Sequence, residues 1–204
     1  MTRTTLLLLK TAVWLLCLIP VGRLIFAAAT NTLGPDPTAA MAFATGLAAL
    51  RLLTVSLAIT PLRKLTPRLN FLIHLRRLLG LFAFFYATLH LLTYVALYAG
   101  FDPSTIATDV SRRRFIFIGV AAWLLLLPLA ATSTRWAIRK LGGQRWNRLH
   151  KLVYLAAVCG VVHYWWQVKP GVRTPLTITL VLGALLLARP LLAWMKRRKP
   201  LAAH

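Results

Sequence analysis

Residues 80–100 read GLFAFFYATLHLLTYVALYAG, and residues 150–168 read HKLVYLAAVCGVVHYWWQV. Each stretch is a long apolar run that contains a histidine, His90 in the first and His163 in the second, and His150 opens the second run. A bilayer core of about 30 Å needs about 20 apolar residues of helix to cross it. Both runs are rich in Leu, Ala and Val without strict alternation, which predicts membrane helices and not the strands of a barrel.

The composition places the whole chain in the same class. Apolar residues make up 59% of the 204 residues, charged residues only 14%, and the mean hydropathy is +0.71, which excludes an ordinary soluble domain. We therefore expect an all-α membrane protein, with one transmembrane domain over residues 1–204 built as a bundle of six transmembrane helices. The apolar stretches that predict these helices are 8–28, 39–60, 78–99, 115–132, 152–168 and 174–195.

The net charge of +22 carries a topology signal. Basic residues gather near both ends and in alternate loops, which under the positive-inside rule places both termini in the cytoplasm. The cluster Arg112–Arg114 runs against the rule and is partly offset by Asp102 and Asp109. The alternating distribution suits the anionic headgroups of a lipid bilayer and argues against a nucleic-acid partner.

The first apolar stretch has a second interpretation. Because it follows Arg3 and Lys10, it loosely resembles a cleavable signal peptide. Pro20, Gly22 and Arg23 interrupt the apolar segment before any small-residue cleavage site, so we favour a retained first helix. Cleavage would leave the orientation of the other helices unchanged.

The histidines indicate a functional site, because ionisable residues at membrane depth are costly. With six alternating crossings, the helices that carry His90 and His163 both run outward. His90 lies 13 residues after Arg77 and His163 lies 12 residues after Lys151, so both lie about 18–20 Å from the inner boundary. Either histidine alone could simply hydrogen-bond a neighbouring helix. Two imidazoles at one depth can clamp one metal, and neutral imidazole is an axial ligand of haem iron.

The sequence also indicates a second, inner site near His150. His150 precedes His163 by 13 residues, about 20 Å along a helix, but their side chains would point about 140° apart on an ideal helix. Local overwinding or a π-bulge would be needed to bring both side chains to one face. His74 is the other inner histidine, and it lies about 160° from the face of His90.

Other residues narrow the chemistry further. Glutamate is absent and no CxxC or CxxCH motif occurs, which excludes paired-glutamate catalysis, thiolate metal sites and covalent c-type haem. Cys17 and Cys159 lie inside apolar stretches and are expected to be inert. An intramembrane arginine needs an anionic partner, and haem propionates would provide one. Arg51 and Arg77 are our candidates for that role.

Two segments carry a resemblance to a known family. Residues 74–90, HLRRLLGLFAFFYATLH, and residues 146–154, WNRLHKLVY, are similar to those of the MsrQ family. That family is the haem-binding membrane subunit of the bacterial periplasmic protein-methionine-sulfoxide reductase system, within the ferric-reductase-like transmembrane family. The resemblance implies that His90 and His163 hold an outer haem b and that His150 is the inner histidine of the fifth helix. The family's remaining inner histidine falls near position 76, where this chain has Arg76 and Arg77, so either one haem is bound or the second uses an unusual partner such as His74.

The resemblance also implies a function and a location, a bacterial inner membrane. Electrons would pass from the quinone pool or a cytosolic flavin reductase, through haem, to a periplasmic molybdopterin-containing subunit that reduces methionine sulfoxide in oxidised proteins. The chain itself would be a redox subunit, with sulfoxide reduction on its partner, and the family is also associated with FMN. Two alternatives stay open: a stand-alone transmembrane ferric or quinone oxidoreductase, and a histidine-relay transporter without haem.

Overall fold

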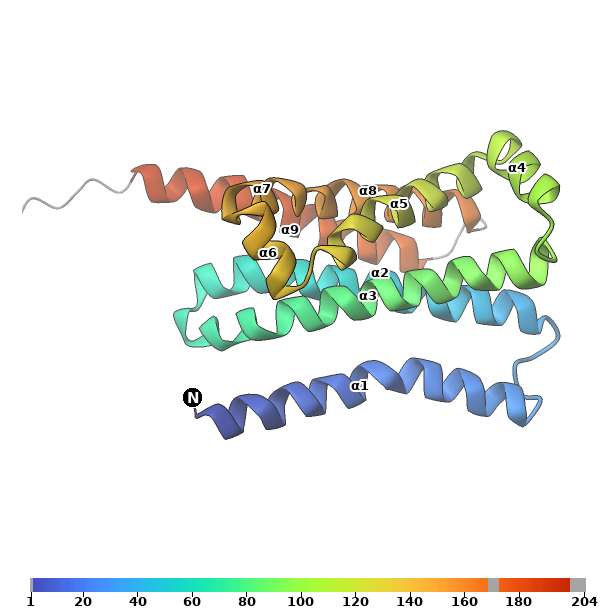
Figure 1. Cartoon of the computed structure of the whole chain (residues 1–204), viewed down its shortest axis with the longest axis horizontal. Coiled ribbons are helices and arrows are strands. Elements are labelled where there is room, and N and C mark those ends of the chain that lie inside the picture. Colours follow the sequence, from blue (N-terminus) through green and yellow to red (C-terminus); the bar gives the residue numbers. More distant parts are fainter. Residues whose placement is uncertain (1, 169–172, 199–204) are drawn as a thin grey trace, which may run out of the picture.

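The computed structural model describes residues 2–168 and 173–198, and every regular element in these two ranges is helical. The long helices run roughly alongside one another, and three short helices lie at the two ends of the bundle (Figure 1). The elements are α1 (Arg3–Ala29), α2 (Pro37–Leu65), the 3₁₀ helix η1 (Pro67–Leu72), α3 (Ile73–Thr93), the π-helical segment η2 (Tyr94–Tyr98), α4 (Pro103–Arg112), α5 (Arg114–Ala131), α6 (Arg135–Leu141), α7 (Gly143–Leu149), α8 (Leu152–Gln167) and α9 (Arg173–Arg198).

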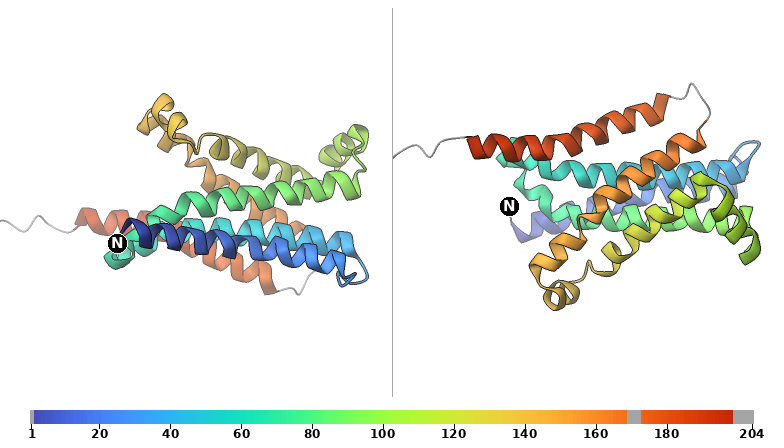
Figure 2. Two further views of the ribbon diagram at one scale, coloured as in Figure 1. Left: turned by 60° about the horizontal axis from the view of Figure 1, so that its bottom comes forward. Right: turned by 90° about the horizontal axis from the view of Figure 1, so that it is seen from above.

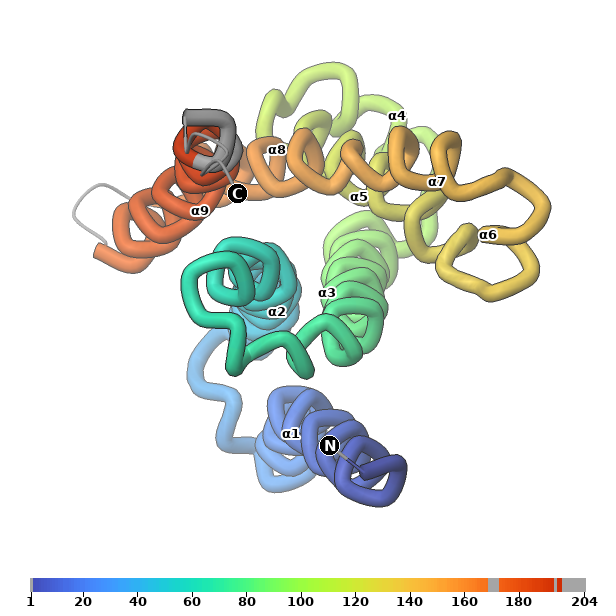
Figure 3. The backbone as a smooth tube through the Cα atoms, turned by 90° about the vertical axis from the view of Figure 1, so that its left-hand side faces the viewer, coloured from blue at the N-terminus to red at the C-terminus, as the bar shows by residue number. Residues whose placement is uncertain are grey.

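The antiparallel pair of α2 and α3 occupies the middle of the bundle (Figures 2 and 3). On one side α5, α8 and α9 cover this pair, and on the other side α1 lies against it. The main apolar core joins α2, α3, α5, α8 and α9, with Ala83 and Ala157 fully buried where these helices meet. A second core joins α1 to α2 and α3 around Tyr86. The histidine-bearing helices α3 and α8 therefore lie in one continuous core.

The expected all-α membrane bundle is confirmed. Five helical segments of the described chain are long and apolar enough to cross a membrane: Arg3–Ala29, Pro37–Leu65, Pro67–Tyr98, Arg114–Ala131 and Arg173–Leu192. In the remaining expected stretch, 152–168, the helix α8 has 16 residues, or about 24 Å of rise against a bilayer core of about 30 Å. Six crossings with both termini inside stay a prediction.

A tyrosine secures the packing of α1 at a proline. Pro20 has no N–H and disturbs the hydrogen-bond ladder of the helix around it. The hydroxyl of Tyr86 on α3 enters this gap: it donates to the carbonyl of Cys17 over 2.7 Å and accepts from the N–H of Val21 over 3.1 Å. A side chain inserted into the ladder is a recognised cause of a helix bend. Tyr86, only 1% exposed, thus joins α3 to the middle of α1.

An arginine does the same for α2. Pro61 lies inside α2 and cannot donate to the carbonyl of Leu57, four residues earlier. Arg189 of α9 supplies the missing donor, with Nη2 2.7 Å from that carbonyl oxygen. Its Nη1 donates to the hydroxyl of Tyr154 on α8 over 2.6 Å, and the guanidinium lies 4.7 Å from the centre of the Tyr154 ring. One cation therefore links three helices.

Candidate functional site

The structure brings His90 and His163 together. His90 is on α3 and His163 on α8, and their ring centroids lie 5.7 Å apart with an interplanar angle of 76°. Both side chains are half-buried. The matched depth of the two histidines in the sequence thus corresponds to a direct approach of the two rings.

Backbone carbonyls fix the tautomer of both rings. Nδ1 of His90 lies 2.9 Å from the carbonyl oxygen of Ala42 on α2, and Nδ1 of His163 lies 2.7 Å from that of Phe115 on α5. A carbonyl oxygen can only accept, so each Nδ1 must carry the proton and donate it. Each Nε2 is then the unprotonated nitrogen with a free lone pair. Such a hydrogen bond is the usual outer support of a metal-ligating histidine, since it orients the ring and raises its basicity.

The pair fits a metal centre with two axial imidazoles. Metal–nitrogen bonds of about 2 Å on both sides, together with the size of the rings, require roughly 6 Å between ring centroids, close to the observed 5.7 Å. A bare ion would need further protein ligands, but residues 2–168 and 173–198 contain no group of three or more His, Cys, Asp or Glu side chains that could hold one. A haem brings its own equatorial ligands and needs only axial ones. The donor set therefore matches a haem better than a bare ion.

Aromatic side chains lie on the helices that carry the pair and on their neighbours, and one of them, Phe115, lies close to the His163 ring. Phe115 lies 6.4 Å from the His163 ring, and Tyr164 lies 6.4 Å from Phe43 of α2, centroid to centroid. Between α5 and α3, Trp123 donates to Thr88 over 3.0 Å and stacks on Phe84. The hydroxyl of Tyr164 is buried and lacks a partner within the described residues. An apolar group with a few polar edges is the chemistry that such a lining accommodates.

His150 does not share a helix with His163. It follows the last residue of α7, and α8 begins only at Leu152. In between, the bonds from Lys151 N to Arg148 O and from Tyr154 N to Lys151 O span three residues, which is local overwinding of the backbone. The His150 ring stacks on Trp146 at 3.8 Å, and its Nε2 lies 3.1 Å from the hydroxyl of Thr132.

The surroundings of His150 are cationic. Burial lowers the pKa of His150, and the nearby positive charge of Arg76 lowers this pKa further, which keeps the imidazole neutral. Arg76 is 14 residues before His90, only about 40° away around an ideal helix. It therefore occupies the place on α3 from which an inner histidine would face His150.

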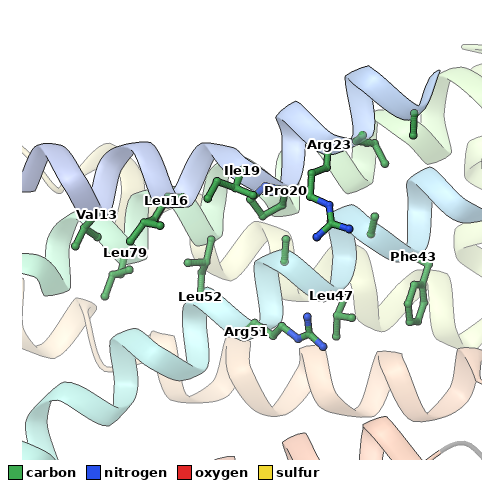
Figure 4. A pocket seen from close by; sticks show the side chains of 15 residues that line it. Val13, Leu16, Ile19, Pro20, Arg23, Phe43, Leu47, Arg51, Leu52 and Leu79 are labelled. Atoms are coloured by element: carbon green, nitrogen blue, oxygen red, sulfur yellow. The ribbon is translucent and has the colours of Figure 1, made fainter. Parts of the chain in front are cut away.

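The structure places the other candidates elsewhere. His74 and Arg77 line a cavity of about 470 Å³ between α3 and α1, together with Lys10. Arg51 lines a larger cavity of about 720 Å³ between α1 and α2, where Arg23 points in from α1 (Figure 4). Arg51 and the group of His74 and Arg77 thus line two different cavities. Cys17 and Cys159 are buried free thiols, as expected of inert residues.

Several residues at the site gave no signal in the sequence. The carbonyl groups of Ala42 and Phe115 are backbone atoms, which no residue pattern reveals. Thr132 is one polar residue in a loop, and its carbonyl also accepts from the indole N–H of Trp146 over 2.9 Å. The tryptophan next to His150 was visible in the sequence, but its stacking depends on the turn at 150–151.

Comparison with known proteins identifies the family. Residues 45–161, which contain His90 and His150, match the family described as the ferric reductase like transmembrane component. A protein of Ralstonia nicotianae is 48% identical over 158 residues, which is 78% of this chain and 72% of the relative. The chain belongs to the MsrQ family, within the ferric-reductase-like transmembrane proteins.

Further MsrQ relatives cover nearly the whole chain. A protein of Herminiimonas arsenicoxydans is 44% identical over 194 residues, 94% of this chain and 88% of the relative. One of Brucella anthropi is 43% identical over 193 residues, 93% of this chain and 86% of the relative. All three relatives are named protein-methionine-sulfoxide reductase heme-binding subunit MsrQ. No solved structure matches the chain.

Proposed function

We propose that this protein is the haem b-containing electron-transfer subunit of a bacterial methionine-sulfoxide reductase system. The observation that carries the proposal is the pair of imidazoles 5.7 Å apart, each with Nδ1 committed to a carbonyl and Nε2 free. Membership of the MsrQ family supports it, since the relatives' names describe a haem-binding subunit of that reductase. When bound, the haem would supply reversible one-electron chemistry within the bilayer.

The residues of this chain would have three tasks. His90 and His163 would bind the iron, in a fixed tautomer and with raised basicity. The apolar core around them would exclude water and set the reduction potential through burial. Bond-making on methionine sulfoxide would take place on a partner subunit, in line with the relatives' description as a heme-binding subunit of that reductase.

The finer parts of the proposal concern direction and partners. With both termini cytoplasmic, α3 and α8 run outward and the histidine pair lies in the outer half of the membrane. That position suits delivery to a periplasmic molybdopterin-containing reductase, with quinone or a cytosolic flavin reductase as donor. A second haem at His150, and an FMN, are further elements that the family resemblance implies.

The first experiment is a reduced-minus-oxidised absorption spectrum of detergent-purified protein expressed with haem supplied. Pyridine-haemochrome quantitation gives the haem per chain, and flavin fluorescence of a denatured sample tests for FMN. We expect a b-type spectrum that is lost in His90→Ala and His163→Ala and kept in His74→Ala, a histidine of the α1–α3 cavity. An intact but colourless wild-type protein would refute the haem assignment and favour a histidine-relay transporter.

A reconstituted system separates the two electron-transfer alternatives. With a quinol or a reduced flavin reductase as donor, haem should become reduced. Reoxidation that requires the periplasmic catalytic subunit and methionine sulfoxide supports the proposed role. Reoxidation by ferric chelate or quinone alone, at an equal rate without that subunit, would instead assign a stand-alone oxidoreductase.

A further inference from the structure

Both histidine rings lie against a glycine of the neighbouring helix. A Cβ atom built on Gly46 of α2 would lie 3.1 Å from Nδ1 and Cε1 of His90. A Cβ atom built on Gly119 of α5 would lie 2.7 Å from Nδ1 and 2.9 Å from Cε1 of His163. Distances below 3.0 Å are not found for real Cβ contacts, and 3.1 Å is tighter than most. Beside an alanine the His163 ring would have to move, and the His90 ring would have to shift by a few tenths of an ångström.

The glycines stand four residues after the carbonyls that the rings bind. Gly46 follows Ala42, and Gly119 follows Phe115. In a helix, residues four apart lie on one face, and each side chain leans toward the N-terminus and covers the preceding turn. A side chain at the fourth position would therefore cover the carbonyl. Glycine leaves it open, and the second lone pair of that oxygen can accept from outside the helix.

The two arrangements are copies of one another. Each hydrogen bond joins residues 48 apart in the chain, and a shift of 73 residues converts Ala42, Gly46 and His90 into Phe115, Gly119 and His163. The same three ring atoms, Nδ1, Cε1 and Cγ, are nearest to the glycine in both cases. The helix pairs that carry them, α2 with α3 and α5 with α8, are the most extensively packed pairs of the described bundle.

We infer that Gly46 and Gly119 are positioning residues, which open two equivalent backbone sockets that hold His90 and His163 with Nε2 directed at one shared metal centre. The inference rests on the proposed haem function for the identity of that metal. Each socket consists of a glycine and the carbonyl four residues before it. Its effect on the ring is to fix both the Nδ1–H tautomer and the orientation.

Four Gly→Ala variants test the inference, because the chain offers matched controls. At Gly80 of α3 an added Cβ would be 3.8 Å from the Ser56 hydroxyl, and at Gly160 of α8 it would be 3.4 Å from a Leu50 methyl group, both ordinary contacts. Alanine is the better helix former at all four positions. Helix propensity alone therefore predicts that all four variants are neutral or stabilised. The inference of two sockets instead predicts that histidine orientation and haem binding are impaired only in the Gly46 and Gly119 variants.

The first measurement uses full-length protein purified with haem. Loss of an outer hydrogen bond to a metal-ligating histidine typically lowers metal affinity about 10–100-fold. We expect a loss of haem affinity in that range for Gly119→Ala and a smaller one for Gly46→Ala, following the 2.7 and 3.1 Å contacts. The low-spin EPR g values of the bound haem should change in both variants, and its midpoint potential should rise, because a less basic imidazole stabilises ferric iron less. Gly80→Ala and Gly160→Ala should match the wild type.

The second measurement does not depend on haem. In haem-free protein labelled with ¹⁵N-histidine, the nitrogen shifts report which ring nitrogen is protonated. We expect the Nδ1–H form for His90 and His163 in the wild type and in both control variants. In Gly119→Ala the His163 signal alone should move toward a tautomer mixture, and in Gly46→Ala the His90 signal alone. Size-exclusion and circular dichroism profiles equal to the wild type identify the folded samples.

The outcomes separate the two proposals. Bis-histidine haem in the wild type, with Gly119→Ala equal to Gly160→Ala in affinity, EPR and tautomer, overturns the sockets and leaves the proposed function standing. A wild type that binds no haem but shows the expected tautomer changes overturns the function and supports the sockets. If Gly119→Ala fails to fold, Gly46→Ala becomes the test, since it requires the His90 ring to shift by only a few tenths of an ångström. Wild-type haem affinity, EPR g values and tautomer in Gly46→Ala would then overturn the inference.

Discussion

Replacing Arg189 by lysine should weaken the bundle, and the reason lies in Pro61. Arg189 donates from two nitrogens at once, over 2.7 Å to the carbonyl of Leu57 and over 2.6 Å to the hydroxyl of Tyr154. Lysine keeps the positive charge but is a point donor that cannot reproduce this two-pronged geometry. Losing one hydrogen bond to a charged group costs about 1.5–3 kcal/mol in soluble proteins, and bonds between membrane helices average about 0.6 kcal/mol. We expect Arg189→Lys to lower the free energy of unfolding by about 1–2 kcal/mol.

The assay is thermal unfolding in detergent, where such a loss lowers the Tm of a chain this size by roughly 2–8 °C. The same substitution should also be measured in a Pro61→Ala background, because an alanine at this position has an N–H that can bond to the carbonyl of Leu57 within α2. In that background the cost of Arg189→Lys should fall by about half or more. Arg23→Lys is the control, since Arg23 makes no hydrogen bond within the described residues. Equal losses for Arg189→Lys with and without Pro61 would refute the reasoning.

Three further predictions concern other parts of the chain. Tyr86→Phe removes both bonds at the bend of α1 and should cost about 1–3 kcal/mol, seen as a lower Tm, whereas the exposed Tyr98→Phe should leave it unchanged. His150→Ala should keep the redox spectrum of the haem held by His90 and His163, because about 17 Å of α8 lies between; loss of all haem would contradict this. Hydrogen bonds from the Thr105 and Ser104 hydroxyls, and from their N–H groups, hold the pKa of Asp102 well below its usual range. The cap they form with Asp102 should therefore stabilise α4 at neutral pH, and this stability should be lost as the pH falls below 3.8 toward the pKa of Asp102 in the folded protein. Cα NMR shifts of residues 103–112 would show the resulting fraying of the helix in acid. Asp102→Ala should abolish this pH dependence.

The fold and the outer site could be predicted from the sequence because both depend on patterns of side chains. Apolar stretches of bilayer length indicate membrane helices regardless of their partners. Two histidines at one distance from the basic inner boundary indicate a shared depth, and a meeting of α3 with α8 then follows from the bundle. The shortness of α8 was already visible in the apolar stretch 152–168. The break in the helix at His150 and Lys151 was not, because neither proline nor glycine stands there.

The same kind of reasoning could not find contacts made by the backbone. The two sockets share only a glycine and a histidine at each position, and the residues that provide the carbonyls, Ala42 and Phe115, have nothing in common as side chains. Arg189 is similar: its partner is a carbonyl that matters only because Pro61 stands four residues later on another helix. A sequence comparison of side chains therefore misses an internal repeat of this kind.

The role of Arg76 could not be predicted from the sequence and became visible only in the structure. In the sequence it is one of two adjacent arginines near the position of the family's inner histidine, and its neighbour Arg77 is our candidate propionate partner. The structure separates them: Arg77 lines the cavity beside α1, whereas Arg76 acts electrostatically on His150. A cation at that place opposes a second positive charge, so His150 stays neutral and keeps a lone pair for a ligand, while Arg76 itself can only donate to an anion. We propose that a group bound between them would pair with both side chains: a haem with its propionates would offer an acceptor for the guanidinium and a site for an imidazole, whereas a bare cation would offer no acceptor.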